Sequence, residues 1–262
     1  MVGGPAAQFS ILAGSMKDLS ENRRPHCLYV VFTSTPYKIG RLIRVVTRNL
    51  YNHVSISLDG SVDGMYSYAR HYKNTPFYGG FVREYPDRYR KEFGVTRVKI
   101  CALPVTEEQY RRTEERFARM IAESDRYPYN LISAFGVPFH KRFLADGSFT
   151  CAEFAVDVLS TVDSRFDPRR FYTIRELEQK LDSGKIYEGE YPAPVLGCED
   201  DFEKEQSTLF YASHTARNFA LLLKCRFGRV TRQADAFRPK ENASCPTPES
   251  PPEQARFPRN QK

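Results

Sequence analysis

The sequence predicts an α+β fold, in which a small antiparallel sheet packs against helices. Two observations support this prediction. Runs of β-branched and aromatic residues, and runs in which polar and apolar residues alternate, lie between residues 27 and 103. Amphipathic segments that begin with helix-capping residues dominate from residue 106 onwards.

Residues 27–34 are predicted to form a buried central strand, because the run Leu28-Tyr29-Val30-Val31-Phe32 is apolar and rich in β-branched and aromatic side chains. Residues 37–50 are predicted to form an amphipathic helix next. A solvated face and a contact with phosphate or an anionic lipid surface both explain its basic stripe. The side chains of this stripe are Lys38, Arg41, Arg44 and Arg48.

Residues 52–59 alternate strictly between polar and apolar side chains, which predicts a half-buried strand with His53 on its polar face. Residues 65–70 follow after a short turn, so the two strands are expected to form a hairpin. The Tyr-, Gly- and Arg-rich residues 78–93 are predicted to form an irregular loop, and residues 95–103 a further strand.

The predicted helices after residue 106 have strong start signals. Capping boxes, in which a Thr is followed three residues later by Glu or Gln, begin at Thr106, Thr150 and Thr173. A short piece at residues 130–135 lies between two prolines, and a last helix covers residues 212–227. The residues of this last helix that are expected to face inward are Phe219, Leu222 and Leu223.

Composition indicates one globular domain with appendages. Of the 262 residues, 41% are hydrophobic, enough for one substantial core, which we place in residues 27–232. Residues 1–26 are predicted to be a flexible extension, and residues 233–262, rich in Pro, Glu, Ser and Lys, a disordered tail. The chain shows neither a signal peptide nor a transmembrane segment, so it is expected to be cytoplasmic.

Composition also narrows the chemistry. The six cysteines are widely scattered, so neither a disulfide framework nor a metal site is expected, and no cofactor motif is found. The net charge of +7 suits an anionic partner but selects none. Nucleic acid is not expected as a partner, because the basic runs lack interleaved aromatic residues and match no known nucleic-acid-binding motif.

Cys151 is the candidate nucleophile. The capping box makes it the first residue of a helix, where free N–H groups and the helix dipole stabilise a thiolate. Of the five histidines, only His53 stands on the polar face of a strand, where a rigid sheet can hold it against the end of a helix. The alternatives are a surface histidine and an inert buried thiol, an interpretation that fits Cys101 and Cys225.

The order of these residues resembles a known family. A strand-borne histidine in Asn52-His53-Val54-Ser55-Ile56, a further strand, and then a cysteine that opens a helix are similar to the circularly permuted branch of the NlpC-type papain-like cysteine peptidase superfamily. In ordinary members the cysteine helix precedes the histidine strand. The permuted branch includes bacterial hydrolases of the YiiX and YaeF type and the lecithin:retinol acyltransferase group. The resemblance covers residues 27–182.

The resemblance implies a permuted papain-like fold with Cys151 as the nucleophile and His53 as the base. A third polar residue on the next strand orients the imidazole in this family; Ser67 is the best match, with Tyr66 or a residue of the segment 78–84 as alternatives. The implied activity is hydrolysis or acyl transfer through an acyl-enzyme thioester, with a peptide, amide, thioester or lipid-ester substrate. The alternative function is a papain-like binding module that recognises a lipid headgroup or an acidic partner through the basic helix.

Overall fold

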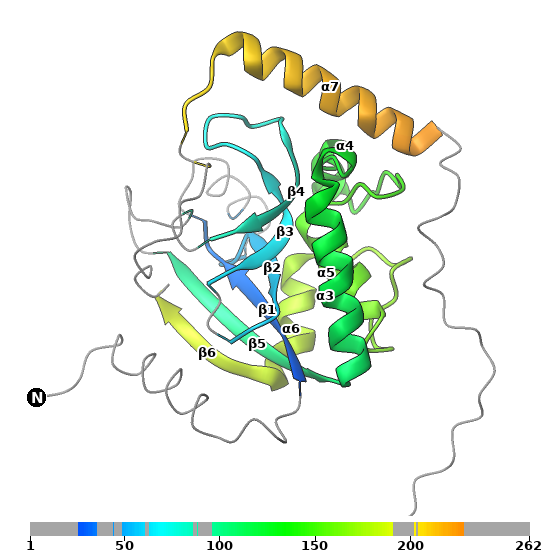
Figure 1. The fold of residues 1–262 in the computed structure, drawn as a ribbon. Helices are drawn as coiled ribbons and strands as arrows, with labels where there is room; N and C mark the ends of the chain where they lie inside the picture. The colour runs from blue at the N-terminus through cyan, green and yellow to red at the C-terminus, as the bar shows by residue number, and fades with distance from the viewer. Residues whose placement is uncertain are drawn as a thin grey trace, which may run out of the picture. The chain divides into compact units, whose positions relative to one another are not determined.

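The described part of the chain forms an α+β structure with a six-stranded antiparallel sheet and five α-helices (Figure 1). The strands lie in the order β4-β3-β2-β1-β5-β6. Among the described helices, none is long and apolar enough to cross a membrane. The computed structural model describes residues 26–35, 44, 49–60, 63–85, 88, 96–190, 202 and 204–227.

The centre of the sheet is β1 (His26–Thr33), which pairs with β2 (His53–Ser57) on one side and with β5 (Arg97–Val105) on the other. The strand β3 (Met65–Arg70) pairs with β2 and completes the predicted hairpin. The central strand, the hairpin and the strand after the loop are therefore confirmed, and the sheet extends beyond them on both sides.

The two outer strands contradict the sequence prediction. Part of the predicted loop forms β4 (Gly79–Glu84), and β6 (Lys185–Glu190) was not expected. A Cβ at Gly79 would lie 2.5 Å from a backbone oxygen of Ala69, and one at Gly80 would lie 2.5 Å from a backbone oxygen. The glycines that suggested a loop instead allow a close approach of neighbouring backbones.

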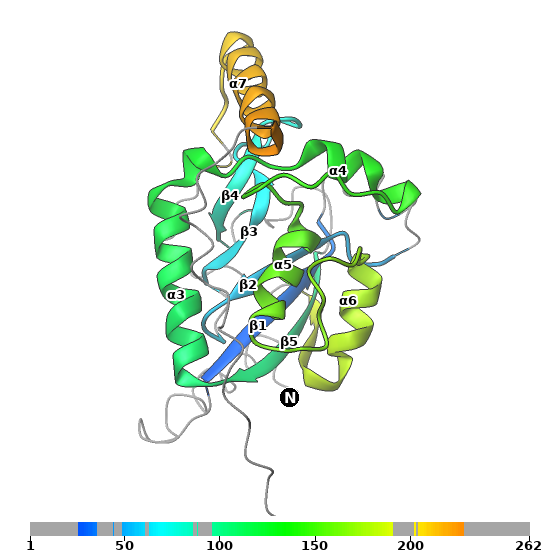
Figure 2. The ribbon, with the colours of Figure 1, turned by 90° about the vertical axis from the view of Figure 1, so that its right-hand side faces the viewer.

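Three helices lie on one face of the sheet (Figures 1 and 2): α3 (Glu107–Ala122), α5 (Cys151–Ser160) and α6 (Ile174–Leu181). Each begins with its predicted capping box. The helix α5 packs against β2 and β3, so its first residue comes close to the sheet. The main core between helices and sheet includes Leu28, Val30, Phe32, Val54, Ile56, Phe117, Phe154 and Leu177.

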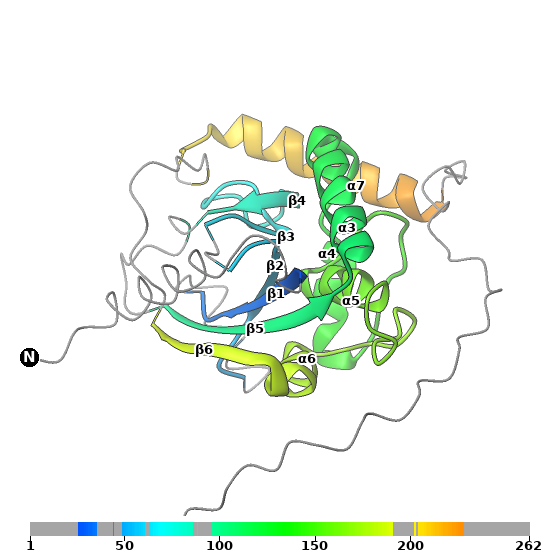
Figure 3. The same cartoon turned by 60° about the horizontal axis from the view of Figure 1, so that its bottom comes forward.

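Two further helices complete the described fold. The helix α4 (Leu131–Gly136) is the predicted short piece, and α7 (Thr208–Phe227) lies beyond β4 (Figure 3). In α7 the side chain of Asn218 is buried and donates a hydrogen bond to the Gly79 carbonyl at 3.0 Å. Phe219 is 45% exposed, so the prediction that it faces inward is wrong.

The strand β2 is buried on both faces, whereas its alternating pattern predicted a half-buried strand. Its polar side chains have partners inside the protein: the Ser57 hydroxyl lies 2.9 Å from the carbonyl oxygens of both Asp59 and Gly64. Hydrogen-bonded polar groups are buried at little cost. The polar face of β2 is therefore an internal surface, and the candidate base lies on this strand.

Candidate active site

Cys151 is the first residue of α5, as predicted, and it is buried. The Thr150 hydroxyl accepts a hydrogen bond from the Glu153 backbone N–H at 3.2 Å, and the Glu153 carboxylate accepts one from the Thr150 N–H at 2.8 Å. This capping box fixes where the helix begins. The sulfur therefore lies at the end of the helix where unpaired N–H groups and the helix dipole favour a negative charge.

The imidazole of His53 pairs with the buried carboxylate of Glu84. The His53 Nε2 atom lies 3.1 Å from Glu84 Oε1 and 3.0 Å from Oε2. Because an ionised carboxylate only accepts hydrogen bonds, Nε2 carries the proton that faces it. The imidazole also interacts with the side chain of Cys151.

Two more side chains converge on the same carboxylate. The Ser55 hydroxyl donates to Glu84 Oε2 at 2.7 Å and lies 3.2 Å from His53 Nε2. The Arg88 guanidinium lies 3.8 Å from Glu84 Oε1. All four side chains are buried, so these contacts form one water-poor cluster around the carboxylate.

The charges of this cluster determine its protonation. Burial alone lowers the pKa of His53, but the charge of Glu84 and the side-chain hydrogen bonds with Cys151 and Glu84 raise that pKa to about 10. Burial alone raises the pKa of Glu84, but His53, Arg88 and Ser55 together lower it to about 2. Near neutral pH the site therefore holds an imidazolium and a carboxylate.

Ser67 does not orient the imidazole, which corrects the sequence prediction. Its hydroxyl is buried and has no hydrogen-bond partner among the described residues. The alternative Tyr66 lies against the ring of Phe117, with centroids 4.6 Å apart. The side chain that contacts the imidazole is instead Glu84, at the end of β4 and within the segment 78–84 that the sequence left open. A strand-like pattern follows Gly79 and Gly80 in the sequence, and this signal could have identified Glu84.

Tyr129 is a further polar side chain near Cys151, and nothing in the sequence singled it out. Burial raises the pKa of Tyr129 well above its ordinary value, and the charges of Cys151 and Glu153 raise it further. The phenol therefore stays protonated near neutral pH and remains a hydrogen-bond donor.

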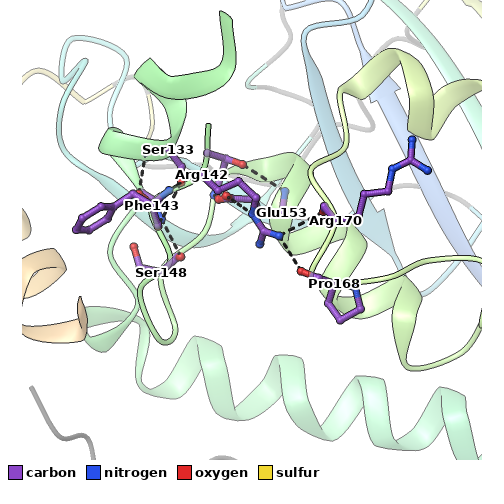
Figure 4. A network of polar contacts seen from close by, with 9 residues as sticks. Ser133, Arg142, Phe143, Ser148, Glu153, Pro168 and Arg170 are labelled. Carbon is purple, nitrogen blue, oxygen red and sulfur yellow. Dashed lines mark hydrogen bonds and ion pairs between the residues drawn. The ribbon is translucent and has the colours of Figure 1, made fainter. Parts of the chain in front are cut away.

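Arg142 fastens the segment before α5 to the segment after it (Figure 4). Its Nε donates to Glu153 Oε1 at 3.1 Å, and its Nη1 donates to the carbonyl oxygens of Pro168 at 2.7 Å and Arg170 at 3.3 Å. Glu153 thus serves both the helix cap and this cross-link. Arg142 holds the start of the nucleophile helix from outside the cluster around Glu84.

Replacing Arg142 by methionine is expected to lower the free energy of unfolding by about 1–3 kcal/mol, because the partly buried carboxylate of Glu153 loses its cation and two carbonyls lose their donor. Denaturant unfolding of the purified protein measures this loss. The matched control is Arg126→Met: Arg126 is 69% exposed and pairs with Glu123, so its loss is expected to cost less than about 1 kcal/mol. Equal losses in both variants would show that Arg142 does not fasten the site.

Arg44 belongs to the predicted basic stripe, but in the structure it is engaged within the protein. Its Nη1 donates to the Thr35 carbonyl at 2.6 Å and to Asn52 Oδ1 at 3.2 Å, just before His53. These contacts hold the guanidinium against the segment that leads into β2. The stripe residues Lys38, Arg41 and Arg48, residues 1–25 of the predicted extension 1–26 and the tail 233–262 lie outside the described residues. The last residue of the predicted extension, His26, is instead the first residue of β1.

No protein-family model, curated protein or solved structure matches this chain. Within the described ranges, no group of three or more His, Cys, Asp or Glu side chains is arranged to hold a metal ion. Function is therefore inferred from the chemistry of the cluster itself.

Proposed function

We propose that the chain is a cysteine hydrolase or acyltransferase that acts on an ester, amide or thioester. Cys151 is the nucleophile, His53 is the base and acid, and Glu84 is the carboxylate that orients the imidazole. The observation that carries the proposal is the buried, hydrogen-bonded His53–Glu84 pair, which interacts with a thiol at the first residue of a helix. A histidine strand that precedes the cysteine helix in the chain also supports a permuted papain-like fold of the NlpC type.

In the first half-reaction the Cys151 thiolate attacks the carbonyl carbon, and a carbon–sulfur bond forms as the carbonyl oxygen becomes an oxyanion. The intermediate collapses, the bond to the leaving group breaks, and His53 donates its Nδ1 proton to that group. The product is a thioester on Cys151 and a neutral imidazole. Glu84 keeps the Nε2 proton in place throughout and stabilises the imidazolium until His53 gives up its Nδ1 proton.

In the second half-reaction the neutral His53 takes a proton from water or from another acceptor, which attacks the thioester carbonyl. The carbon–sulfur bond breaks, and the thiolate and the imidazolium are restored. Hydrolysis and acyl transfer differ only in this acceptor, so one site supports both.

The oxyanion needs hydrogen-bond donors close to the sulfur. The backbone N–H of Cys151 is one of the first-turn groups of α5 that have no partner within the helix. This N–H is expected to stabilise the charge that develops on the carbonyl oxygen of the substrate.

Alkylation with limiting iodoacetamide near neutral pH tests the proposal. Cys151 is expected to react at least about tenfold faster than the other described cysteines, because an imidazolium favours its thiolate. Burial raises the pKa of Cys27 and Cys225, and raises that of Cys101 to about 11. Peptide mass spectrometry gives the rate at each residue, and the unfolded chain is the control in which the rates converge. If Cys151 reacts no faster than the half-buried Cys27, the proposed nucleophile is wrong.

A further inference from the structure

Arg88 lies between the catalytic carboxylate and an aromatic ring. Its Nη1 atom is 3.8 Å from Glu84 Oε1 and donates a hydrogen bond to the Arg70 carbonyl at 3.0 Å. Its guanidinium carbon lies 4.7 Å from the centroid of the Phe202 ring. The face of an aromatic ring attracts a cation at this distance. The buried guanidinium is therefore held from three directions, one of which is the site.

Phe202 is fixed in place by the connection between β3 and β4. It is 3% exposed, and its carbonyl accepts a hydrogen bond from the Lys73 N–H at 2.8 Å. The Arg70 guanidinium lies 5.6 Å from the same ring and donates to the Lys73 carbonyl at 2.7 Å. A residue that lies after β6 in the chain is thus bonded to the turn between β3 and β4.

Glu84 therefore faces two cations, the His53 imidazolium and the Arg88 guanidinium. A carboxylate that is shared between two cations holds each of them less firmly than it holds one alone. His53 has to give up a proton in each turnover, so an unshared Glu84 would retain the imidazolium too strongly. The Arg88 guanidinium weakens this retention of the imidazolium by Glu84.

We propose that Arg88 and Phe202 are positioning residues of the site: Phe202 holds Arg88 beside Glu84, and Arg88 limits how firmly Glu84 holds the protonated ring of His53. The catalytic role of Arg88 and Phe202 rests on the proposed function. The electrostatic coupling of Arg88 to His53 through Glu84 does not. The groups that act on the imidazole are Ser55 of β2, Glu84 of β4 and Cys151 of α5, with Arg88 beyond Glu84.

Nuclear magnetic resonance of the histidine side chains tests the coupling without a substrate. In Arg88→Met the titration midpoint of His53 is expected to rise, by on the order of half a pH unit or more, because Glu84 loses its second cation. Phe202→Leu removes the ring face and is expected to shift the midpoint in the same direction by less. Arg88→Lys and Phe202→Tyr keep the charge and the ring, and both are expected to stay close to the wild-type value.

The matched control is Arg83→Met. Arg83 neighbours Glu84 on β4, but it is exposed and lies over the rings of Tyr66 and Tyr85, so its loss is expected to leave the His53 midpoint unchanged. Thermal unfolding of each variant shows whether it is folded, and Phe202→Leu keeps the test open if Arg88→Met does not fold.

An unchanged or lowered midpoint in Arg88→Met overturns the proposal. A shift in Arg88→Met with none in Phe202→Leu overturns the part assigned to Phe202. These outcomes are separate from the fate of the proposed function, because the His53 midpoint is measured whether or not Cys151 proves to be a nucleophile. If Cys151 is reactive but the His53 midpoint is unchanged in Arg88→Met, the proposed enzyme function stands and the proposed role of Arg88 is wrong.

Discussion

Replacing Cys151 by alanine is expected to abolish acyl-enzyme formation and to lower the turnover of a p-nitrophenyl ester by at least about 10⁴-fold, to the background rate. The reason is structural: among the described cysteines, Cys151 alone begins a helix and interacts with an imidazolium. Intact-protein mass spectrometry is expected to show one acyl group on the wild-type chain, released by hydroxylamine as a thioester requires, and none on the variant.

The matched control is Cys27→Ala, which removes a half-buried thiol on β1. This variant is expected to keep the acyl adduct and the wild-type turnover. An adduct that persists in Cys151→Ala, or that disappears in Cys27→Ala, would contradict the assignment of the nucleophile.

Replacing Glu84 by glutamine is expected to lower turnover by about 10²–10⁴-fold, although the two side chains have nearly the same shape. Without the carboxylate charge, only the influence of Cys151 opposes that of burial, so the pKa of His53 is expected to fall from about 10. A smaller fraction of the imidazole is then protonated at any pH below the wild-type midpoint. The amide also has N–H groups that donate to Nε2, which favours the tautomer with its proton on Nδ1, facing the sulfur.

Ester turnover and a histidine resonance titration measure the two effects of Glu84→Gln separately. The informative control is Ser67→Ala, because Ser67 was the orienting residue that the sequence favoured and its hydroxyl contacts no partner among the described residues. Ser67→Ala is expected to keep wild-type turnover and the wild-type His53 midpoint. A larger loss in Ser67→Ala than in Glu84→Gln would restore the sequence-based assignment.

The features that the sequence predicted correctly are local. The start of α5 at Cys151 follows from a capping box that is complete within four residues, Thr150 to Glu153. The placement of His53 on a strand follows from a strict alternation over a few residues. Such signals depend only on neighbours in the chain, so they can be interpreted without knowledge of the fold.

The features that the sequence missed depend on distant partners. Glu84 was hidden because Gly79 and Gly80 resemble loop residues, and only the close approach of other backbones explains why a strand needs them. Tyr129 and Phe202 belong to no sequence motif, and only the fold brings them near the residues of the candidate site. In α7 the outward face of Phe219 reflects a partner surface that buries Asn218 instead, which no periodicity reveals.

The order of the strands and helices along the chain suggests that the His53–Glu84 pair and Cys151 come together at different stages of folding. The strands β2, β3 and β4 are consecutive and pair antiparallel, so short-range hairpins bring His53 and Glu84 together across 31 residues. Cys151 joins them only when α5, from a much later part of the chain, docks on β2 and β3. We therefore expect a folding chain to assemble the charged pair first and to bring Cys151 to it only as the fold is completed.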